Sequence, residues 1–168
     1  MKRRTFGLLA ASGLALGVSG CSSSKFRTYR GPEVTSVVVE KGARRMYLLH
    51  NDEVLKSYDI FLGFAPEGHK QFEGDGKTPE GIYYIDRRNP NSSFHLSLGI
   101  SYPNAEDIAF ARAHGKSPGG DIFIHGQPNG AAKAKRGDWT WGCIAVRNRE
   151  MEDIYAMVRN GTPIAIRP

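Results

Sequence analysis

The stretch VTSVVVEK, Val34–Lys41, predicts a β-strand, because its β-branched residues favour an extended backbone. Two further runs of the same kind follow at Arg45–His50 and Val54–Phe61. The polar residues Asn51–Glu53 separate them, which predicts a hairpin with a tight turn. The folded part of the chain therefore begins with strands that pair with their neighbours in sequence.

The rest of the chain continues this pattern of short elements. A long loop rich in Gly and Pro follows Phe61, and the later apolar runs predict strands at Ile82–Asp86, Phe94–Ser101, Asp121–His125, Ile144–Val146 and Thr162–Arg167. Two helices are predicted. One spans Asn104–His114 with Asn104 as N-cap, and the other starts at Asn148 and is stopped by Gly161. The second helix has one apolar face, formed by Met151, Ile154, Tyr155 and Val158. With no internal repeat, the prediction is one mostly-β domain, a sandwich or barrel-like fold with two short helices.

The N-terminal segment has the features of an export signal. A basic start at residues 2–4 precedes a short apolar run at residues 6–18. The ending Val18–Cys21 resembles a bacterial lipobox, in which cleavage precedes the cysteine and Cys21 is lipidated; an ordinary cleaved signal is the alternative. The predicted boundaries are residues 1–21 for the signal, 22–33 for a polar tether and 34–168 for the domain.

This signal predicts an exported, periplasmic protein anchored to a membrane by lipid. Ser22 after the cysteine favours the outer membrane by resemblance to known sorting signals. The pair Arg3-Arg4 also leaves the twin-arginine route open beside the general one.

Composition and charge are those of a soluble globular domain. Of 168 residues, 40% are hydrophobic and 24% charged, and the formal net charge is +6. Without the three cations at residues 2–4 the balance falls to 20 basic and 17 acidic side chains, a net charge of +3. No stripe of Lys and Arg interleaved with aromatic residues is present, so we expect no nucleic acid partner.

The second cysteine, Cys143, has no partner for a disulfide if Cys21 carries lipid. A small buried apolar residue is one interpretation. The other starts from His125, which ends a predicted strand before Gly126 and is followed 18 positions later by Cys143, itself preceded by Gly142. A thiol nucleophile needs an imidazole to take its proton and space for an acyl group to approach. The pattern therefore favours cysteine-based acyl chemistry.

Four stretches in this order resemble the L,D-transpeptidase catalytic domain, also called YkuD-like: GKTPEGIYYI (Gly76–Ile85), SSFHLSLGISYPN (Ser92–Asn104), DIFIHGQPNG (Asp121–Gly130) and WTWGCIAV (Trp139–Val146). With the flanking strands the resemblance covers Val34–Pro168. It implies a mostly-β fold and an enzyme acting on peptidoglycan stem peptides, with no metal or other cofactor. The cysteine attacks the peptide bond after the third stem residue, D-alanine leaves, and an amine resolves the thioester.

Matched by motif position, the resemblance assigns Cys143 as nucleophile, His125 as proton acceptor and donor, and Gly142 as part of the oxyanion hole with the Cys143 N–H. It further implies substrate-binding positions at His95, Tyr102, Gly126, Thr140 and Trp141.

The sequence departs from the family pattern at two positions. Ala145 stands where most members have arginine, so Arg147, or alternatively Arg149, is predicted to bind the substrate, although both suit a charged helix start. Trp141 replaces the usual His or Arg and predicts a narrow, apolar rim.

Other interpretations remain beside a transpeptidase. The same thiol chemistry resolved by water would make a carboxypeptidase, or a hydrolase that releases protein from the wall. A non-catalytic, wall-binding lipoprotein is a third, which the intact His125 and Cys143 disfavour. A zinc site formed by His95, Asp121 and His125 lacks the spacing typical of metal ligands.

Overall fold

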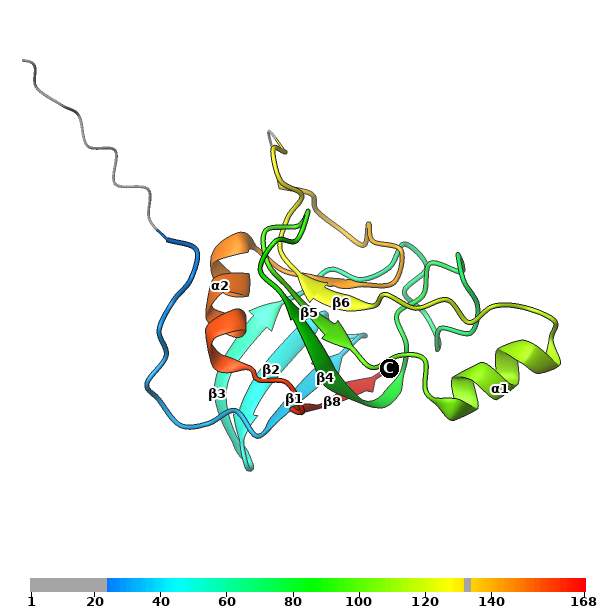
Figure 1. Cartoon of the computed structure of the whole chain (residues 1–168), viewed down its shortest axis with the longest axis horizontal. Coiled ribbons are helices and arrows are strands. Elements are labelled where there is room, and N and C mark those ends of the chain that lie inside the picture. Colours follow the sequence, from blue (N-terminus) through cyan, green and yellow to red (C-terminus); the bar gives the residue numbers. More distant parts are fainter. Residues whose placement is uncertain (1–23, 132–133) are drawn as a thin grey trace, which may run out of the picture.

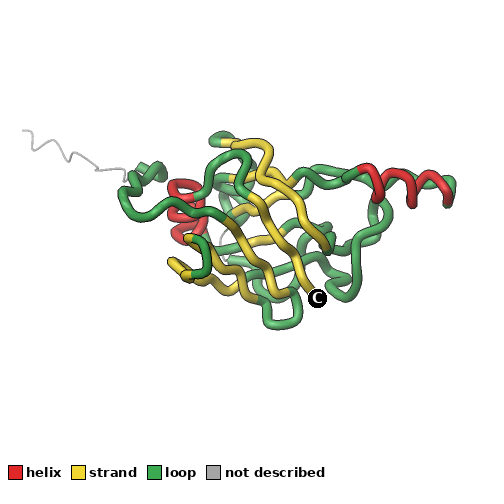
Figure 2. Tube along the Cα trace, turned by 90° about the horizontal axis from the view of Figure 1, so that it is seen from below, coloured by secondary structure: helices red, strands yellow, loops and turns green. Residues whose placement is uncertain are grey.

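The computed structural model describes residues 24–131 and 134–168, so the predicted signal segment and Cys21 lie outside the described residues. Within these ranges, eight strands form one curled sheet in the order β3-β2-β1-β8-β4-β5-β6-β7 (Figures 1 and 2). The strands are β1 (Ser36–Glu40), β2 (Arg45–His50), β3 (Glu53–Asp59), β4 (Gly81–Asn89), β5 (Ser97–Ile100), β6 (Phe123–His125), β7 (Ile144–Ala145) and β8 (Pro163–Arg167). The predicted mostly-β fold with two helices is confirmed.

The sheet curls until its two ends approach each other. Most neighbouring strands are antiparallel, while the pairs β1–β8 and β6–β7 are parallel. A register shift between Ile85 and Arg87 in β4 lets this strand pair with β8 at one end and β5 at the other. Beyond β3, Phe61 forms an isolated bridge with Ala145 of β7. The chain that follows β3, one edge strand, thus meets β7, the other edge strand, and this contact gives the domain its barrel-like closure.

The core lies inside this curl. Alternate residues of each inner strand point inward, as the period of two in an extended chain requires. Val37, Val39, Met46 and Leu48 have no exposed surface. Burying such side chains stabilises a fold by about 1.5–3 kcal/mol each. The hairpin predicted from Arg45 onward therefore pairs edge to edge with the first strand, and the register Val39↔Met46 places both apolar side chains on the same inward face.

Helix α2 (Asn148–Met157) covers the core beside β5 and β6. Its buried residues include Met151, Ile154 and Tyr155, so the predicted apolar face is confirmed. The helix ends at Met157, before the predicted stop at Gly161, because Val158 already has an extended backbone.

Helix α1 (Ala105–Ala113) projects from the end of the molecule opposite α2 (Figure 1). The predicted N-cap is confirmed: the Asn104 side chain accepts hydrogen bonds from the backbone N–H groups of Glu106 and Asp107. Only Asp107 and Ala111 are buried among its residues, which explains why this helix lies mainly in solvent.

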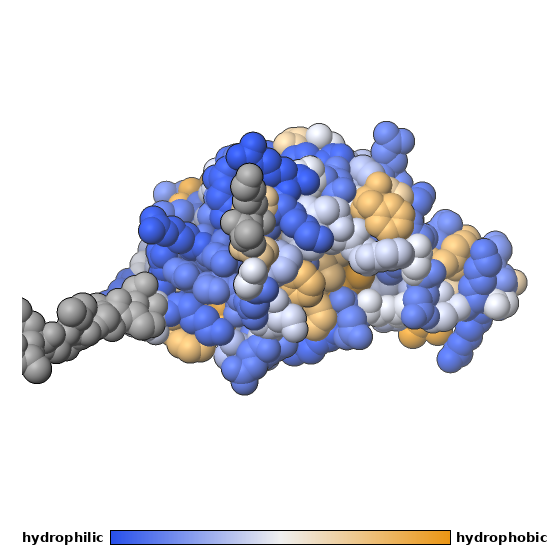
Figure 3. All heavy atoms as spheres, turned by 90° about the horizontal axis from the view of Figure 1, so that it is seen from above, coloured by the Kyte–Doolittle hydropathy of each residue, from blue (hydrophilic) through white to orange (hydrophobic). Residues whose placement is uncertain are grey.

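Two segments differ from the sequence prediction. The strand predicted from Phe94 begins only at Ser97, because His95 has a left-handed backbone with φ of 69° and cannot continue a strand. The segment predicted as a tether, in its described part, lies along the domain and contacts α2 through Arg27. The face shown in Figure 3 is mostly hydrophilic, with hydrophobic side chains in small separate groups.

Candidate active site

A cleft of about 380 Å³ opens at the end of β6, and both Cys143 and His125 line it. Their shared orientation follows from strand geometry. The parallel pairing places Ile124 opposite Ile144 and His125 opposite Ala145. Because successive side chains alternate between the faces of a sheet, Cys143 and His125 point to the same side, away from the buried Ile124 and Ile144.

The imidazole of His125 is held in one orientation by its neighbours. Its Nδ1 lies 2.7 Å from the Gly126 carbonyl oxygen, and its ring centroid lies 4.5 Å from that of Phe94. A carbonyl oxygen only accepts, so Nδ1 carries the proton and Nε2 is left with its lone pair. Burial lowers the pKa of His125, and the hydrogen bond to Gly126 opposes this only in part. The ring is therefore a neutral base whose free nitrogen is Nε2.

The thiol of Cys143 is partly exposed and donates to the carbonyl oxygen of Asp121 at 3.5 Å. Burial raises its pKa, and the charge of Asp121 raises it further, while a hydrogen bond to the Phe123 backbone and the charges of Lys70 and Arg87 act in the opposite direction. The lowered pKa of His125 and the raised pKa of Cys143 each favour the uncharged form of the side chain. In the unliganded state the site consequently holds a neutral thiol beside a neutral imidazole.

A tight turn fixes the backbone around the thiol. The Thr140 hydroxyl donates to the Cys143 carbonyl oxygen at 2.7 Å and accepts from the Gly142 N–H at 3.2 Å. Gly142 has φ of 120°, and a Cβ there would lie 2.5 Å from the Lys77 carbonyl oxygen. Glycine is thus required at this position. Because its N–H already donates to Thr140, the oxyanion role predicted for Gly142 has no free donor in this state, and the Cys143 N–H becomes the better candidate.

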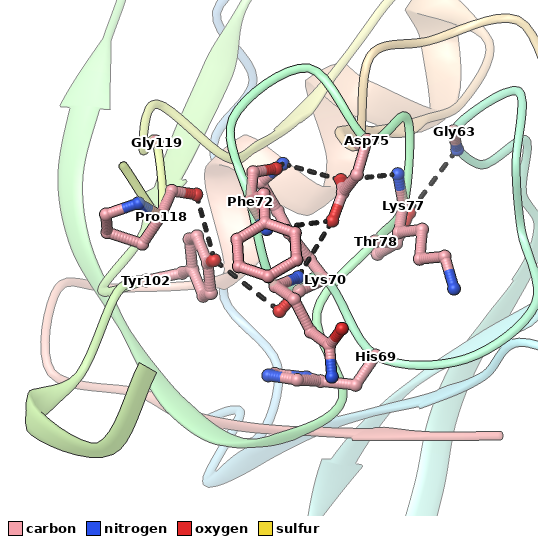
Figure 4. Close-up of polar contacts among 12 residues, drawn as sticks. Gly63, His69, Lys70, Phe72, Asp75, Lys77, Thr78, Tyr102, Pro118 and Gly119 are labelled. Atoms are coloured by element: carbon pink, nitrogen blue, oxygen red, sulfur yellow. Dashed lines mark hydrogen bonds and ion pairs between the residues drawn. The ribbon is translucent and has the colours of Figure 1, made fainter. Parts of the chain in front are cut away.

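The long loop after β3 packs against this turn through the backbone of Lys77. Figure 4 shows Asp75 at its centre, where the carboxylate accepts from the backbone N–H groups of Phe72 and Lys77 and from the ammonium of Lys70, at 2.9–3.0 Å. Burial alone would raise the pKa of Asp75, but these hydrogen bonds lower it. Thr78 accepts from the Gly63 N–H in the same network. The loop that carries the TP-x-G motif therefore acts as a rigid support for Gly142.

The model of the L,D-transpeptidase catalytic domain family matches residues 35–166, which contain the cleft and all four motifs. The chain belongs to this family.

Three relatives show how far the similarity of this L,D-transpeptidase family member extends. YafK of Escherichia coli K12, whose name assigns it provisionally to the L,D-transpeptidases, is 30% identical over 156 residues, covering 90% of this chain and 56% of that protein. YkuD of Bacillus subtilis, named in the same provisional way, is 27% identical and covers 77% and 64%. The crystal structure of a point mutant of Pgp2 from Campylobacter jejuni, a protein that determines helical cell shape, has a TM-score of 0.62 at 28% identity, with coverage of 82% and 48%. The chain thus spans little more than half of YafK and about half of the Pgp2 chain.

Several residues predicted to bind substrate lie outside the cleft lining. His95 points to α2, where its Nε2 lies 2.9 Å from Glu152 Oε1. Tyr102 is buried and donates to the Pro118 carbonyl oxygen at 3.0 Å, as Figure 4 shows. Both predictions located a motif correctly but not the direction of its side chains, and both residues support the fold around the site.

Two other predicted positions also need correction. Gly126 packs tightly, since a Cβ there would lie 2.6 Å from the Asn148 side chain, and only its carbonyl serves the site. Arg147 is an exposed N-cap of α2 that pairs with Glu150 at 3.3 Å. It lines a separate hollow with Lys135 and Arg136, and Arg149 is likewise exposed.

Thr140 and Trp141, two of the positions predicted to bind substrate, line the cleft. Trp141 is 71% exposed and its ring meets that of Phe64 edge-on, with centroids 4.9 Å apart. Phe94 and Trp139 also line the cleft and contact the His125 ring, although the motif gave them no role. Their aromatic character beside a motif histidine was the available signal.

The described ranges, residues 24–131 and 134–168, contain neither a cluster of metal ligands nor a membrane-spanning helix. There, no group of three or more His, Cys, Asp or Glu side chains is placed to hold a metal ion. No helix within those ranges is long and apolar enough to cross a membrane.

Proposed function

We propose that this chain is a peptidoglycan L,D-transpeptidase with Cys143 as nucleophile and His125 as general base and acid. The observation that supports this most directly is the hydrogen bond from His125 Nδ1 to the Gly126 carbonyl. It leaves Nε2 as the proton acceptor in the same cleft as the thiol. Family membership supports peptidoglycan stem peptides as the substrate class, and we infer that the donor is the tetrapeptide stem.

The proposed reaction begins from the neutral pair. A rotation about the Cα–Cβ bond of Cys143 turns the thiol from the Asp121 carbonyl toward His125 Nε2, which takes its proton. Sγ then attacks the carbonyl carbon of the third stem residue. The peptide C–N bond breaks, the terminal D-alanine leaves with the proton from His125, and a thioester remains.

An amine from an acceptor stem then attacks the thioester. His125 takes the proton of the amine and returns it to the sulfur as the new amide bond forms, which produces a cross-link between third residues or attaches another group. During both steps we propose that the Cys143 N–H donates to the developing oxyanion. Loss of one such donor typically lowers the rate by about 10²–10³.

Hydrolysis is the second candidate, and one observation favours it. Ala145, at the position where the family resemblance expects arginine, is fully buried and bridges to Phe61. No side chain from this position reaches the cleft to hold an acceptor, so water could resolve the thioester instead. The outcome would be a carboxypeptidase, or an enzyme that releases wall-bound protein.

The test uses the full-length chain purified in detergent and incubated with tetrapeptide muropeptides. Mass spectrometry distinguishes the reactions, since dimers report transfer and tripeptide monomers report hydrolysis. Cys143→Ala should abolish both products, whereas Arg167→Ala, on an exposed strand end, should keep wild-type turnover. Undiminished turnover by Cys143→Ala would refute the nucleophile assignment. A carbapenem should also acylate the wild-type thiol, seen as a mass increase that the Ala variant lacks.

We also propose that the chain is exported and lipidated on Cys21, so that the domain works beside a membrane, which the Ser22 signal favours as the outer one. The proposal is supported by the lipobox-like ending of the N-terminal segment. Labelling cells with a fatty-acid analogue should tag the wild-type chain and not Cys21→Ala. Equal labelling of both would argue against it.

A further inference from the structure

The chain before the sheet forms an arm, residues Lys25–Tyr29, that docks on α2 and on the segment 90–95. The aromatic ring of Tyr29 packs against the core, and that of Phe26 lies 6.3 Å from the ring of Tyr155. The arm thus has apolar contacts at two points along its length. Its polar contacts are more specific, and they connect the arm to residues that line the cleft.

Lys25 holds both ends of the segment 90–95. Its ammonium donates to the carbonyl oxygens of Pro90 at 2.7 Å and His95 at 3.1 Å. Between these two carbonyls lie Ser92, Ser93 and Phe94, which form one wall of the cleft. One cation therefore bridges the two ends of the cleft wall, and charge-assisted hydrogen bonds of this kind are among the stronger ones.

Arg27 reaches the same segment through α2. Its guanidinium donates to Glu152 Oε2 at 2.9 Å and 2.7 Å and to Asp153 at 2.7 Å. The other oxygen of Glu152 lies 2.9 Å from Nε2 of His95. Burial alone would raise the pKa of Glu152, but the hydrogen bonds from Arg27 and His95 lower it. The carboxylate is therefore ionised and couples the arm to the wall.

The wall in turn contacts the general base. Phe94, the neighbour of His95, packs on the His125 ring with centroids 4.5 Å apart, and its carbonyl accepts from the Gly126 N–H at 3.0 Å. The backbone of Phe94 thus joins the residue whose carbonyl orients His125. A displacement of the segment 90–95 would alter the shape of the cleft beside the imidazole.

We propose that the arm positions this wall for substrate, with Lys25 and Arg27 as positioning residues that do not touch the substrate. The proposal rests on the proposed function, because it concerns how the stem peptide is held. The segment 90–95 connects β4 to β5. Asn129 hydrogen-bonds to the middle of this segment, through the carbonyls of Ser92 and Ser93 and the N–H of His95. By binding the Pro90 and His95 carbonyls, the arm also restrains the two ends of the segment before the substrate binds, which lowers the entropic cost of binding.

The test is the double variant Lys25→Ala/Arg27→Ala in the full-length chain, purified in detergent. We expect KM for a tetrapeptide stem to rise about threefold to tenfold, the range given by loss of a few partly exposed charge-assisted contacts, with kcat within about twofold of wild type. Iodoacetamide does not depend on the cleft wall for binding, so it should alkylate Cys143 at the wild-type rate. Lys25→Arg, which retains a cationic donor, should keep most of the affinity that Lys25→Ala loses.

Two further measurements keep the outcome clear. Arg167→Ala removes an exposed ion pair remote from the arm and should leave KM unchanged. Hydrogen exchange should become faster in the segment 90–95 of the double variant and not in that of Arg167→Ala, and this readout requires no turnover at all. If neither the wild type nor the double variant processes stem peptides, the proposed function fails, while the exchange result still tests the role of the arm.

The proposal is overturned by an unchanged KM together with unchanged exchange in the segment 90–95. It is also overturned if alkylation, kcat and thermal stability all fall in parallel with affinity. That pattern would mean that the arm only stabilises the whole domain.

Discussion

Gly142→Ala would place a methyl group where the backbone around the thiol leaves no space. The new Cβ would lie 2.5 Å from the Lys77 carbonyl oxygen and 3.2 Å from the side chain of Ile122. The first neighbour belongs to the backbone of the loop that Asp75 holds rigid, so it cannot move away without breaking that network. Gly142 also has φ of 120°, a conformation that alanine adopts only with strain.

The loss of folding free energy expected for Gly142→Ala has two parts. A side chain in such a backbone conformation costs about 1–3 kcal/mol. Forcing one extra methyl into a packed site costs about 1–3 kcal/mol more. Their sum, about 2–6 kcal/mol, is a large fraction of the 5–15 kcal/mol typical of a domain. At about 3–5 °C for each kcal/mol in a domain of this size, Tm should fall by about 6 °C or more.

Gly74→Ala is the matched control. Gly74 also has a positive φ, 78°, but a Cβ there meets nothing within 4 Å. It should show only the conformational cost, about 1–2 kcal/mol. Thermal unfolding of both variants gives the comparison, and iodoacetamide alkylation reports the exposure of Cys143. If Gly142→Ala unfolds within a degree or two of Gly74→Ala and is alkylated like wild type, the close approach of Lys77 does not constrain the thiol.

Three more predictions concern charges and the cleft rim. Burial lowers the pKa of His125 and raises that of Cys143, so the acid limb of kcat/KM should lie below about pH 6.5 and the alkaline rise of alkylation above about pH 8.5; ordinary values for both would contradict the neutral resting pair. Asp75→Asn leaves the buried Lys70 without its carboxylate and should lower the free energy of unfolding by about 2 kcal/mol or more, measured by urea titration. Because the folded-state pKa of Asp75 is lowered, the difference between variant and wild type should shrink as the pH falls below about 4, and a constant difference would exclude the ion pair as its cause. Trp141→Ala, which removes an exposed ring at the rim, should raise KM for stem peptides several-fold without changing Tm, whereas Tyr84→Ala, also exposed but remote from the cleft, should change neither.

Local signals in the sequence were sufficient for most of the elements. The β-branched run at Val37–Val39 and the spacing of Met151, Ile154 and Tyr155 each fix a buried face, because burial of apolar side chains repeats with the period of the element. The closure of the sheet was not predictable in this way. It depends on Phe61 meeting Ala145 across 84 positions, and no local pattern carries that contact. Lys41 is another example: a lysine at a strand end suggests solvent, yet its ammonium is buried and donates to the Gly68 and Thr78 carbonyls.

In the site, too, the sequence predicted some side-chain positions and not others. Ordered motifs predicted that His125 and Cys143 lie together, and the β6–β7 register places both in one cleft. The motif around His95 gave the right segment and the wrong neighbour. Phe94 and His95 diverge because the backbone of His95 is left-handed, so the ring of Phe94 lies on His125 while that of His95 lies on Glu152. A left-handed residue interrupts the alternation on which any counting argument depends. The same break lets one short segment contact His125 on one side and the N-terminal arm on the other.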